Sequence, residues 1–503
     1  MTGLTWVLVA LVLLGALPLL VADYQFLLVA LHFRRLHYAK CAPYLPRVAV
    51  VIPAWNEAAV IGTSVDRLMR LDYPLSALRI IVVDDASTDA TPEVAAAKAA
   101  QYPGHVVHLR RERGGEGKAA TLNHGLDRVL ADDWAQAILI IDADVIYEPA
   151  SLRRMTWHLA DPEVGSVTAY IKEGSRPGNY MTRFIGYEYV VASAAARRSQ
   201  EVLGAIACLA GGAQLHSRQN LEAIGGQVDT STLAEDTVTT FQTQLGGRRA
   251  VFEPHAVVWS EEPGSITALW RQRSRWARGN MQVTRKFKGV WFRPRSSGSG
   301  PCSRLGSLSF GLMWFCLLLL PIFMVCASAS LITLFFIGHQ LAWTAFHVLW
   351  LVNVVTYVFI TSFALLIDPQ TARRAWRAAL LFPGLVNVVI LLAAVLPGPL
   401  SLLARTLLSA AGIPLSSGLI QGVQLFTYTW LAACMGVAYL AVVAESRRLG
   451  WLTGPLFVWI GGYGPLLCAV TIAAYVKEIR HAEARWDKTE KTGQVVAATG
   501  PGP

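Results

Sequence analysis

The runs IIVVDD, at residues 80–85, and ILIIDAD, at residues 138–144, decide the fold of this chain. Each is a short stretch of β-branched and aliphatic residues that ends in carboxylates, as expected for a buried strand followed by a loop. Similar runs lie at residues 48–53 and 106–109, and helical stretches at residues 57–71 and 118–130 separate them. Strands that alternate with helices predict a parallel α/β sheet. Ligands of such sheets bind at the carboxyl ends of the strands, where this chain has its acids.

Outside the α/β region the chain is strongly apolar. Its 503 residues are 53% hydrophobic and only 16% charged, whereas soluble domains contain about 25% charged residues. Residues 305–444 contain five charged residues in all. This distribution predicts one globular domain joined to one membrane domain. It excludes a disordered chain, a collagen-like fibre and a disulfide scaffold.

The N-terminal apolar run, at residues 4–31, is long enough to cross a hydrocarbon core, which needs about 20 residues. No basic segment precedes it and no small-residue cleavage site follows it, so we predict a retained transmembrane helix over residues 1–33 rather than a signal peptide. Arg34, Arg35 and Lys40 come after this run. The positive-inside rule therefore places the N-terminus outside and the next domain in the cytoplasm.

Five further apolar runs predict membrane helices within residues 305–476. They cover residues 305–337, 341–367, 378–396, 419–444 and 451–476. Five crossings would leave the basic tail, residues 477–503, outside the cell, against the positive-inside rule. We therefore expect that one run, either 378–396 or the following 397–414 segment, is miscounted or re-entrant. The tail is predicted to be disordered, and the protein to be a multi-pass protein of the inner or plasma membrane.

The acids at the strand ends indicate a site for a nucleotide diphosphate. Asp84 and Asp85 close one predicted strand, and Asp142 and Asp144 close another. Two acids spaced one residue apart present hard oxygen ligands to a divalent cation, which can in turn hold a diphosphate. Either pair alone is equally compatible with a simple turn, because aspartate favours turns.

The segment GGEGKAATLNHGL, at residues 114–126, places a Gly-rich turn before a predicted helix and Lys118 near the helix N-terminus. Backbone N–H groups, the helix dipole and an ammonium group all attract an anion there. The segment lacks the GK[ST] ending of a P-loop. The surrounding acids favour a metal-bridged diphosphate instead.

Six motifs occur in an order that resembles the processive family 2 glycosyltransferases with a GT-A fold, which include cellulose, chitin, hyaluronan and poly-N-acetylglucosamine synthases. The motifs are VVIPAWNE (50–57), VVDDAS (82–87), GKAATLN (117–123), IDAD (141–144), LAEDT (233–237) and QRSRW (272–276). The resemblance covers residues 47–278. It implies an α/β GT-A (Rossmann-like) cytoplasmic domain inserted between transmembrane α-helices.

The resemblance also assigns roles to the acids and to Lys118. Asp84 and Asp85 would contact the uridine and its diphosphate, and Lys118 would support the phosphates. Asp142 and Asp144 would form the DxD site for Mg²⁺ or Mn²⁺, with Asp142 also contacting the nucleotide sugar.

Asp236 matches the acid of the TED motif of this family, which deprotonates the acceptor hydroxyl. An inverting transfer needs one such carboxylate base on the face of the sugar opposite the leaving group. The chain reads Ala234-Glu235-Asp236 here, so the threonine of the motif is missing. A helix N-terminus, which favours acids, is the structural alternative for this acid pair.

The QRSRW stretch matches the QxxRW feature associated with processive members. Gln272 and Trp276 would bind the acceptor, because an indole ring offers a flat face to a sugar, and Arg275 suits a bidentate contact with the leaving diphosphate. Gly211 and Gly212 lie where the family shapes its acceptor pocket, although a tight turn explains them equally well. The basic stretch at residues 279–304 is more typical of an interfacial helix on anionic lipid than of a nucleic-acid site.

The leading interpretation is a membrane-embedded, metal-dependent, inverting glycosyltransferase that extends a β-linked polysaccharide from a UDP-sugar, with its own helices as an export route. The product is expected to be nearest to poly-N-acetylglucosamine. The first alternative is a non-processive transferase that loads one sugar onto a polyprenyl phosphate or another lipid. The second, a transporter with a nucleotide-sensing domain, leaves Asp236 and the QRSRW motif unexplained. Expected partners are the donor, the growing polymer and the bilayer, and any control by cyclic-di-GMP would need an accessory membrane subunit.

Overall fold

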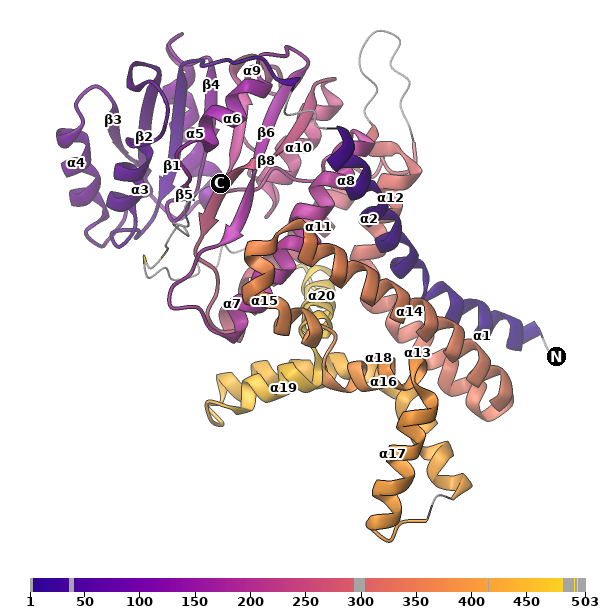
Figure 1. The fold of residues 1–503 in the computed structure, drawn as a ribbon. Coiled ribbons are helices and arrows are strands. Elements are labelled where there is room, and N and C mark those ends of the chain that lie inside the picture. Colours follow the sequence, from indigo (N-terminus) through magenta and orange to yellow (C-terminus); the bar gives the residue numbers. More distant parts are fainter. Residues whose placement is uncertain are drawn as a thin grey trace. The chain divides into compact units, whose positions relative to one another are not determined.

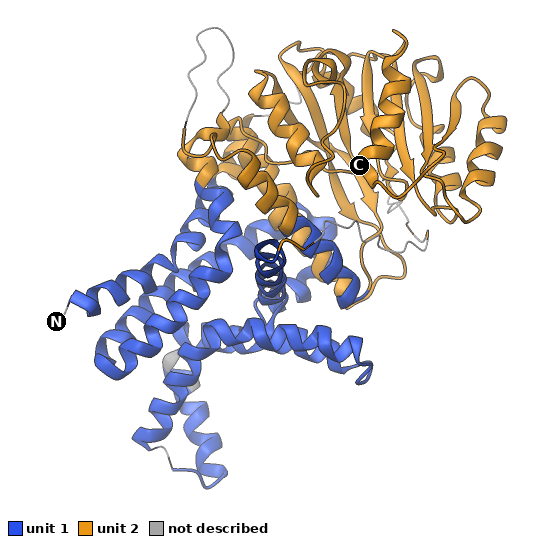
Figure 2. Cartoon of the chain, turned by 180° about the vertical axis from the view of Figure 1, so that it is seen from behind, with its two compact units in different colours: residues 1–27, 265–277, 312–480 blue, residues 28–264, 278–311, 481–503 orange. Residues whose placement is uncertain are grey.

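The computed structural model describes residues 3–35, 40–293, 304–414, 416–482, 493 and 495. Contacts divide the chain into two compact units, shown in Figure 2. Unit 1 comprises residues 1–27, 265–277 and 312–480, and unit 2 comprises residues 28–264, 278–311 and 481–503. Each unit has a hydrophobic core of its own.

An eight-stranded sheet forms the centre of unit 2, with the strand order β3-β2-β1-β4-β7-β6-β8-β5 (Figure 1). The strands are β1 (Val48–Ala54), β2 (Leu78–Asp84), β3 (Val106–Arg110), β4 (Ala137–Ile140), β5 (Ile146–Tyr147), β6 (Val164–Glu173), β7 (Gln214–Ser217) and β8 (Arg249–Ser260). The first four strands are mutually parallel, as the sequence predicted. β7 runs antiparallel to both β4 and β6, and β5 runs antiparallel to β8.

The antiparallel strands β5 and β7 were not among the strands that the sequence predicted. The direction of β7 follows from where the chain enters it. Gln214, its first residue, pairs with Ile140, the last residue of β4. The chain thus arrives at the carboxyl edge of the parallel strands and has to run back across the sheet.

Helices cover both faces of the sheet, and this sandwich explains the near-continuous aliphatic strands. Side chains of β1 alternate between the two faces. Val50 and Ile52 join the core formed with α3, α4 and α6, whereas Ala49 and Val51 join the core formed with α5 and α9. The helices of unit 2 are α3 (Ile61–Leu68), α4 (Thr91–Gln101), α5 (Lys118–Leu130), α6 (Ser151–His158), α7 (Tyr180–Glu188), α8 (Ala195–Leu203), α9 (Arg218–Ala223) and α10 (Glu235–Leu245). A π-helix, η3 (Tyr189–Ala194), joins α7 to α8.

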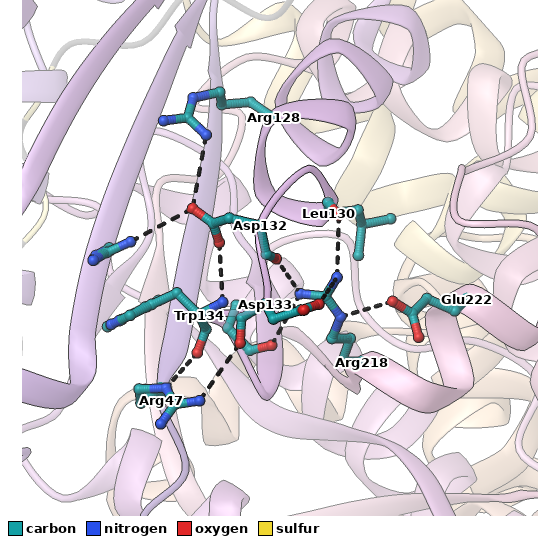
Figure 3. A network of polar contacts seen from close by, with 10 residues as sticks. Arg47, Arg128, Leu130, Asp132, Asp133, Trp134, Arg218 and Glu222 are labelled. Atoms are coloured by element: carbon teal, nitrogen blue, oxygen red, sulfur yellow. Dashed lines mark hydrogen bonds and ion pairs between the residues drawn. The ribbon is translucent and has the colours of Figure 1, made fainter.

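The connection between α5 and β4 is clamped at the sheet edge opposite the strand-end acids (Figure 3). Arg218, the first residue of α9, donates to the carbonyl oxygens of Leu130 at 3.1 Å and Asp132 at 2.5 Å. Arg47, just before β1, donates to the carbonyl oxygen of Trp134. These bonds fix the C-terminal end of α5, the helix whose other end carries Lys118.

Unit 1 consists of apolar helices. Among the described residues, four stretches are long and apolar enough to cross a membrane, or up to six if each of two bent helix pairs is one span. The four are α1 with α2 (Gly3–Arg35), α13 (Leu320–Ile337), α14 (His339–Ile367) and α18 (Ser417–Ser446). The bent pairs are α15 (Pro369–Leu381) with α16 (Leu385–Val395), at 80°, and α19 (Thr453–Gly461) with α20 (Tyr463–Ile479), at 95°. The remaining helices are α11 (Ile266–Lys286), which continues into unit 2 after Ala277, α12 (Leu308–Leu318) and α17 (Pro397–Ala410).

The first apolar run is broken into α1 (Gly3–Leu14) and α2 (Leu17–Arg35), where the sequence predicted a single helix. Pro18 explains the break, because proline clashes with the preceding helical turn and has no N–H to donate to it. Within α2, Oδ2 of Asp23 accepts a hydrogen bond of 2.7 Å from the Thr356 hydroxyl of α14. A carboxylate is costly in lipid, and this acid faces another helix instead.

The 378–396 run, one of the two suspected of being re-entrant, bends between α15 and α16. Pro383 and Gly384, with φ of +96° at the glycine, occupy the break. Membrane sidedness stays a prediction. Residues 294–303 of the predicted interfacial segment, and residues 483–492, 494 and 496–503 of the predicted tail, lie outside the described residues.

Candidate functional site

Lys118, the first residue of α5, lies at the centre of a charged cluster at the carboxyl edge of the sheet. Its Nζ is 2.6 Å from Oδ1 of Asp142 and 3.4 Å from Oε1 of Glu235. Burial favours the neutral amine, but attraction to Asp142 and Glu235 outweighs it and raises the pKa of Lys118 above its ordinary value. Lys118 therefore stays protonated beside these carboxylates, and its ammonium group is the positive charge at this edge that could attract a phosphate.

Asp236 lies in the first turn of α10, and its Oδ1 accepts a hydrogen bond of 2.7 Å from the Thr237 backbone N–H. Burial and the neighbouring Glu235 raise the pKa of Asp236 to about 6, although Lys118 acts in the opposite direction. A carboxylate with a pKa near 6 is ionised at neutral pH and is more basic than an ordinary aspartate. These are the properties of a general base.

Gly211 keeps the space between the charged groups open. A Cβ atom at this position would lie 3.1 Å from Nζ of Lys118, 3.5 Å from Oδ2 of Asp236 and 3.7 Å from Oδ2 of Asp142. The structure thus brings together three charged residues predicted to act on the sugar donor and the acceptor, around one glycine of the predicted acceptor pocket.

The loop at residues 204–213, which contains this glycine, is fixed to α10 by buried side chains. The Thr240 hydroxyl accepts a hydrogen bond of 2.9 Å from the Leu209 backbone N–H. The Gln244 amide accepts from the N–H of Ile206 at 2.9 Å and donates to its carbonyl oxygen at 2.7 Å. The helix that carries Asp236 therefore also positions the loop facing it.

Asp142 and Asp144 follow β4 and are the candidate metal ligands. The Asp142 side chain is 37% exposed, and Asp144 is buried. No group of three His, Cys, Asp or Glu side chains in the described part of the chain is arranged to hold a metal ion. Mg²⁺ usually takes one or two protein carboxylates and completes its coordination with phosphates and water. The donor set of two carboxylates fits such an ion. A Cβ atom at Gly212 would lie 2.7 Å from Cγ2 of Val145 and 3.6 Å from Oδ2 of Asp142, so the close packing of Val145 accounts for this glycine.

Asp84 and Asp85 lie at the end of β2 in a second group of charges. Asp84 is fully buried, and its Oδ2, 3.4 Å from Nε of Arg110, has no hydrogen-bond partner among the described residues. Asp85 pairs with Arg111 and accepts a hydrogen bond of 3.2 Å from the Gly115 N–H. A buried carboxylate oxygen without a donor is costly, so Asp84 has an acceptor available for a ligand. Asp85 ties the Gly-rich turn before α5 to this group.

Gln272, Arg275 and Trp276 lie on α11, within the part that belongs to unit 1. Gln272 is buried, Arg275 is partly buried, and Trp276 is 38% exposed. The guanidinium of Arg273 lies 4.0 Å from the centroid of the Trp276 ring. The structure thus groups these three residues with the apolar helices, and the acids and Lys118 with unit 2.

The first turn of α11 is capped by Glu445, near the end of α18. Its carboxylate accepts from the backbone N–H of Ile266 at 3.2 Å and of Thr267 at 2.6 Å, and also from the Thr267 hydroxyl. The first N–H groups of a helix have no partner within the helix, and the helix dipole favours a negative charge there. A carboxylate from a candidate membrane span therefore fixes the start of the helix that carries the QRSRW motif.

Sequence reasoning missed several neighbours of the predicted residues. Glu235 entered only as part of an imperfect motif, yet its carboxylate contacts Lys118. Arg110 pairs in register with Asp84 across β2 and β3, and a correct strand alignment would have found it. Cys208 lies beside Asp236, and burial together with that carboxylate raises the pKa of the Cys208 thiol well above its ordinary value. No sequence signal marks Cys208.

Comparison with known proteins finds that residues 46–279 match the family described as "Glycosyltransferase like family 2". The chain is 33% identical over 251 residues to "Probable glycosyltransferase YdaM" of Bacillus subtilis (strain 168), which covers 50% of this chain and 59% of that protein. It is 32% identical over 279 residues to a beta-monoglucosyldiacylglycerol synthase of Synechocystis sp., covering 56% of each chain. It is 27% identical over 237 residues to a poly-beta-1,6-N-acetyl-D-glucosamine synthase of Staphylococcus epidermidis, covering 47% of this chain and 55% of that one. The chain thus spans little more than half the length of these relatives.

Proposed function

We propose that residues 46–279, which match the glycosyltransferase family 2 model and contain the eight-stranded sheet, form a GT-A-like domain. We further propose that the protein is a membrane-embedded, inverting glycosyltransferase that uses a UDP-sugar and a divalent metal ion. The observation that carries the proposal is the grouping of Asp236, Lys118 and Asp142 around Gly211. The proposed base Asp236, the ammonium group of Lys118 and the candidate metal ligand Asp142 thus surround the space next to Gly211.

In the proposed reaction, the acceptor hydroxyl attacks the anomeric carbon of the donor sugar. Asp236 takes the hydroxyl proton, the bond from the anomeric carbon to the phosphate oxygen breaks, and UDP leaves with that electron pair. Attack from the face opposite the leaving group inverts the configuration at this carbon. The pKa of Asp236, raised to about 6 by burial and Glu235, leaves it ionised at neutral pH and able to accept the proton.

The remaining polar residues are proposed to bind the nucleotide. Asp142 and Asp144 would hold Mg²⁺ or Mn²⁺, and the bound ion would neutralise charge on the departing diphosphate. Lys118 stays protonated and attracts the phosphates. Oδ2 of Asp84, which forms an ion pair with Arg110 but has no hydrogen-bond partner among the described residues, would accept a donor group of the nucleoside. Asp85 holds the Gly-rich turn in place.

A growing polysaccharide is the first proposed acceptor. Two features support it: the QRSRW motif, with a partly exposed Trp276 that offers an aromatic face to a sugar, and the similarity to a poly-beta-1,6-N-acetyl-D-glucosamine synthase. The candidate membrane spans of unit 1 would then provide the route for export.

A lipid is the second proposed acceptor. Its support is the similarity to a beta-monoglucosyldiacylglycerol synthase, which is 32% identical to this chain, against 27% for the polysaccharide synthase. A lipid hydroxyl would need the same base and the same donor site, so the two acceptors differ only in what occupies the space beyond Asp236.

The experiment that tests these proposals uses the full chain in lipid nanodiscs with radiolabelled UDP-N-acetylglucosamine, UDP-glucose and, as a contrasting donor, GDP-mannose. Products are separated by extraction into organic solvent and by gel filtration of the aqueous phase. We expect Mg²⁺- or Mn²⁺-dependent transfer from a UDP-sugar, abolished by excess EDTA and by Asp236→Asn.

Label of high molecular weight in the aqueous phase supports the polysaccharide acceptor, and label in the organic phase supports the lipid. Transfer undiminished in EDTA would refute the metal requirement. Transfer from GDP-mannose alone would refute the UDP-sugar assignment. Absence of transfer from every donor, in protein that still binds UDP, would overturn the proposed function.

A further inference from the structure

Three side chains in unit 2, outside the charged clusters described above, form a hydrogen-bonded row. Cys41 lies between α2 and β1, His158 is the last residue of α6, and Glu253 lies in β8. Sγ of Cys41 is 3.1 Å from Nδ1 of His158, and Nε2 of His158 is 2.6 Å from Oε2 of Glu253. His158 and Glu253 are 4% and 3% exposed, whereas Cys41 is partly exposed.

Both nitrogens of the His158 ring are thus engaged, one by a thiol and the other by a carboxylate. This is the order of a nucleophile, a base and the group that orients the base. The second oxygen of Glu253 accepts a hydrogen bond of 2.8 Å from the His255 backbone N–H. Because both of its oxygens act as acceptors, the geometry suits an ionised carboxylate, and a buried carboxylate favours a positive charge on the ring beside it.

The charge on the ring supports the same assignment. Burial lowers the pKa of His158, but the hydrogen bonds with Cys41 and Glu253 outweigh burial and raise it to about 9. An imidazolium in contact with a thiol stabilises the thiolate, as in other cysteines paired with protonated histidines. A purely structural role, tying the segment between α2 and β1 to α6, would not need a charged ring.

We propose that Cys41 is a reactive nucleophile, activated by His158, which Glu253 orients, and that it is a site at which hydroperoxides modify this protein. Cys41 is partly exposed as a residue, which is compatible with access of a small electrophile, while its two partners are shielded from solvent. This inference does not depend on the proposed transfer reaction.

The chemistry balances with the hydroperoxide as the oxidant. The Cys41 thiolate attacks one peroxide oxygen, an S–O bond forms and the O–O bond breaks. Sulfur loses two electrons to the peroxide and becomes a sulfenic acid. The departing oxygen leaves as hydroxide and takes a proton from the His158 imidazolium to become water.

The chain provides an internal reference for the test. The described cysteines are Cys41, Cys208, Cys316, Cys326, Cys434 and Cys468. Cys208 is also partly exposed, but burial and Asp236 raise the pKa of its thiol well above the ordinary value. At equal access to a reagent, Cys208 should therefore react more slowly than Cys41.

The experiment treats the purified full chain with hydrogen peroxide and dimedone, which traps sulfenic acids, at pH 6, and maps the adducts by mass spectrometry. An ordinary thiol, with a pKa near 8.5, is less than about 1% ionised at this pH. We expect the adduct on Cys41 to form at least about ten-fold faster than on Cys208, because His158 contacts the Cys41 sulfur, whereas burial and Asp236 raise the pKa of the Cys208 thiol. Equal or slower labelling of Cys41 would overturn the proposal.

Variants and unfolding then test the mechanism. His158→Gln keeps a hydrogen-bonding side chain without a charge and should slow labelling of Cys41 about ten-fold, with Cys208 unchanged. A rate equal to wild type would exclude activation by His158. If this variant does not fold, the labelling rate of Cys41 is compared in native and in guanidinium-unfolded wild-type protein. We expect the native protein to label faster. A faster reaction after unfolding would refute an activated thiolate.

Discussion

The side chains of aspartate and asparagine have nearly the same shape, so Asp236→Asn keeps the shape of the site and removes the proposed base. General base catalysis contributes about 10²- to 10⁴-fold to a rate. We expect the turnover number of this variant to fall by that factor, and its affinity for the UDP-sugar, measured by calorimetry, to stay within a few-fold of wild type. An equally steep loss of affinity would make Asp236 a ligand of the nucleotide or metal rather than the base.

The pH dependence of turnover provides a separate test of the same residue. Burial and the charge of Glu235 raise the pKa of Asp236 to about 6, and a base has to be ionised to accept a proton. Turnover should therefore fall as the pH drops through about 6. Glu235→Gln removes one of the two causes, so the acidic limb of its kcat profile should move to lower pH. If the acidic limb of the kcat profile stays at the same pH in Glu235→Gln, the group that titrates there is not Asp236.

The core of the candidate site could be predicted from the sequence, but its surroundings could not. Asp142, Lys118 and Asp236 stand in recognisable motifs, and they do converge around Gly211. Cys208 and the partners of Asp84 come from other elements, and only tertiary packing brings them near. The motif also does not reveal that the pKa of Asp236 is raised, because this shift depends on burial and on the neighbouring Glu235.

At the scale of elements, the cap of α11 leads to a prediction about the acceptor. Glu445→Ala removes the acceptor of two backbone N–H groups and one hydroxyl, and losing a helix cap costs about 1 kcal/mol. Because α11 carries Gln272 and Trp276, we expect shorter polymers or a higher KM for the acceptor, with nucleotide binding unchanged. Glu445→Gln retains one acceptor oxygen and should be milder. If both variants behave as wild type, the cap has no influence on the acceptor.

The clamp on the α5–β4 connection leads to a prediction about stability. Arg218 has a side chain only 15% exposed and donates to two backbone carbonyl oxygens. Hydrogen bonds from charged groups contribute about 1.5–3 kcal/mol. Arg218→Ala should lower the melting temperature of the detergent-solubilised protein by about 4–8 °C. The control is Arg128→Ala. The Arg128 side chain is 55% exposed, and its Nη1 lies 3.8 Å from Oδ2 of Asp132, so this variant should change the melting temperature little. Equal shifts in both variants would argue against the clamp.

Predictability differed from element to element. α5 begins and ends where its sequence pattern predicts. α3 begins at Ile61 instead of residue 57, because the preceding residues bind a neighbouring loop. Asn56 has φ of +54°, its Oδ1 accepts from the Thr88 N–H at 2.9 Å, and the Glu57 N–H donates to the Thr91 hydroxyl at 2.7 Å. The direction of β7 depends on the edge at which the chain enters the sheet, and local periodicity does not contain that information.

At the scale of the whole molecule, the untested prediction is sidedness. Arg34, Arg35 and Lys40 follow the first candidate span, so residues 47–278 should lie in the cytoplasm. A protease added to intact cells should spare this region and cleave it once the membrane is opened. Replacing Arg34, Arg35 and Lys40 with glutamine should weaken this orientation. A separate variant with Arg447→Gln and Arg448→Gln serves as the control and should weaken it less. Cleavage within 47–278 in intact wild-type cells would refute the cytoplasmic placement.

The joint anchoring of Asp236 and the 204–213 loop on α10 has a consequence for altering acceptor choice. Thr240 and Gln244 hold the loop on the helix by hydrogen bonds. The distance between the Asp236 carboxylate and the loop is therefore fixed by α10. Substitutions on α10 would move the Asp236 carboxylate and the loop together. They would therefore disturb the position of the proposed base before they changed the space between it and the loop. Beyond the backbone atoms that Thr240 and Gln244 hold, a Cβ atom at Gly211 would lie 3.1 Å from Nζ of Lys118, so this position should stay a glycine. A directed-evolution library aimed at a new acceptor should therefore spare α10 and Gly211 and vary the other residues of the loop.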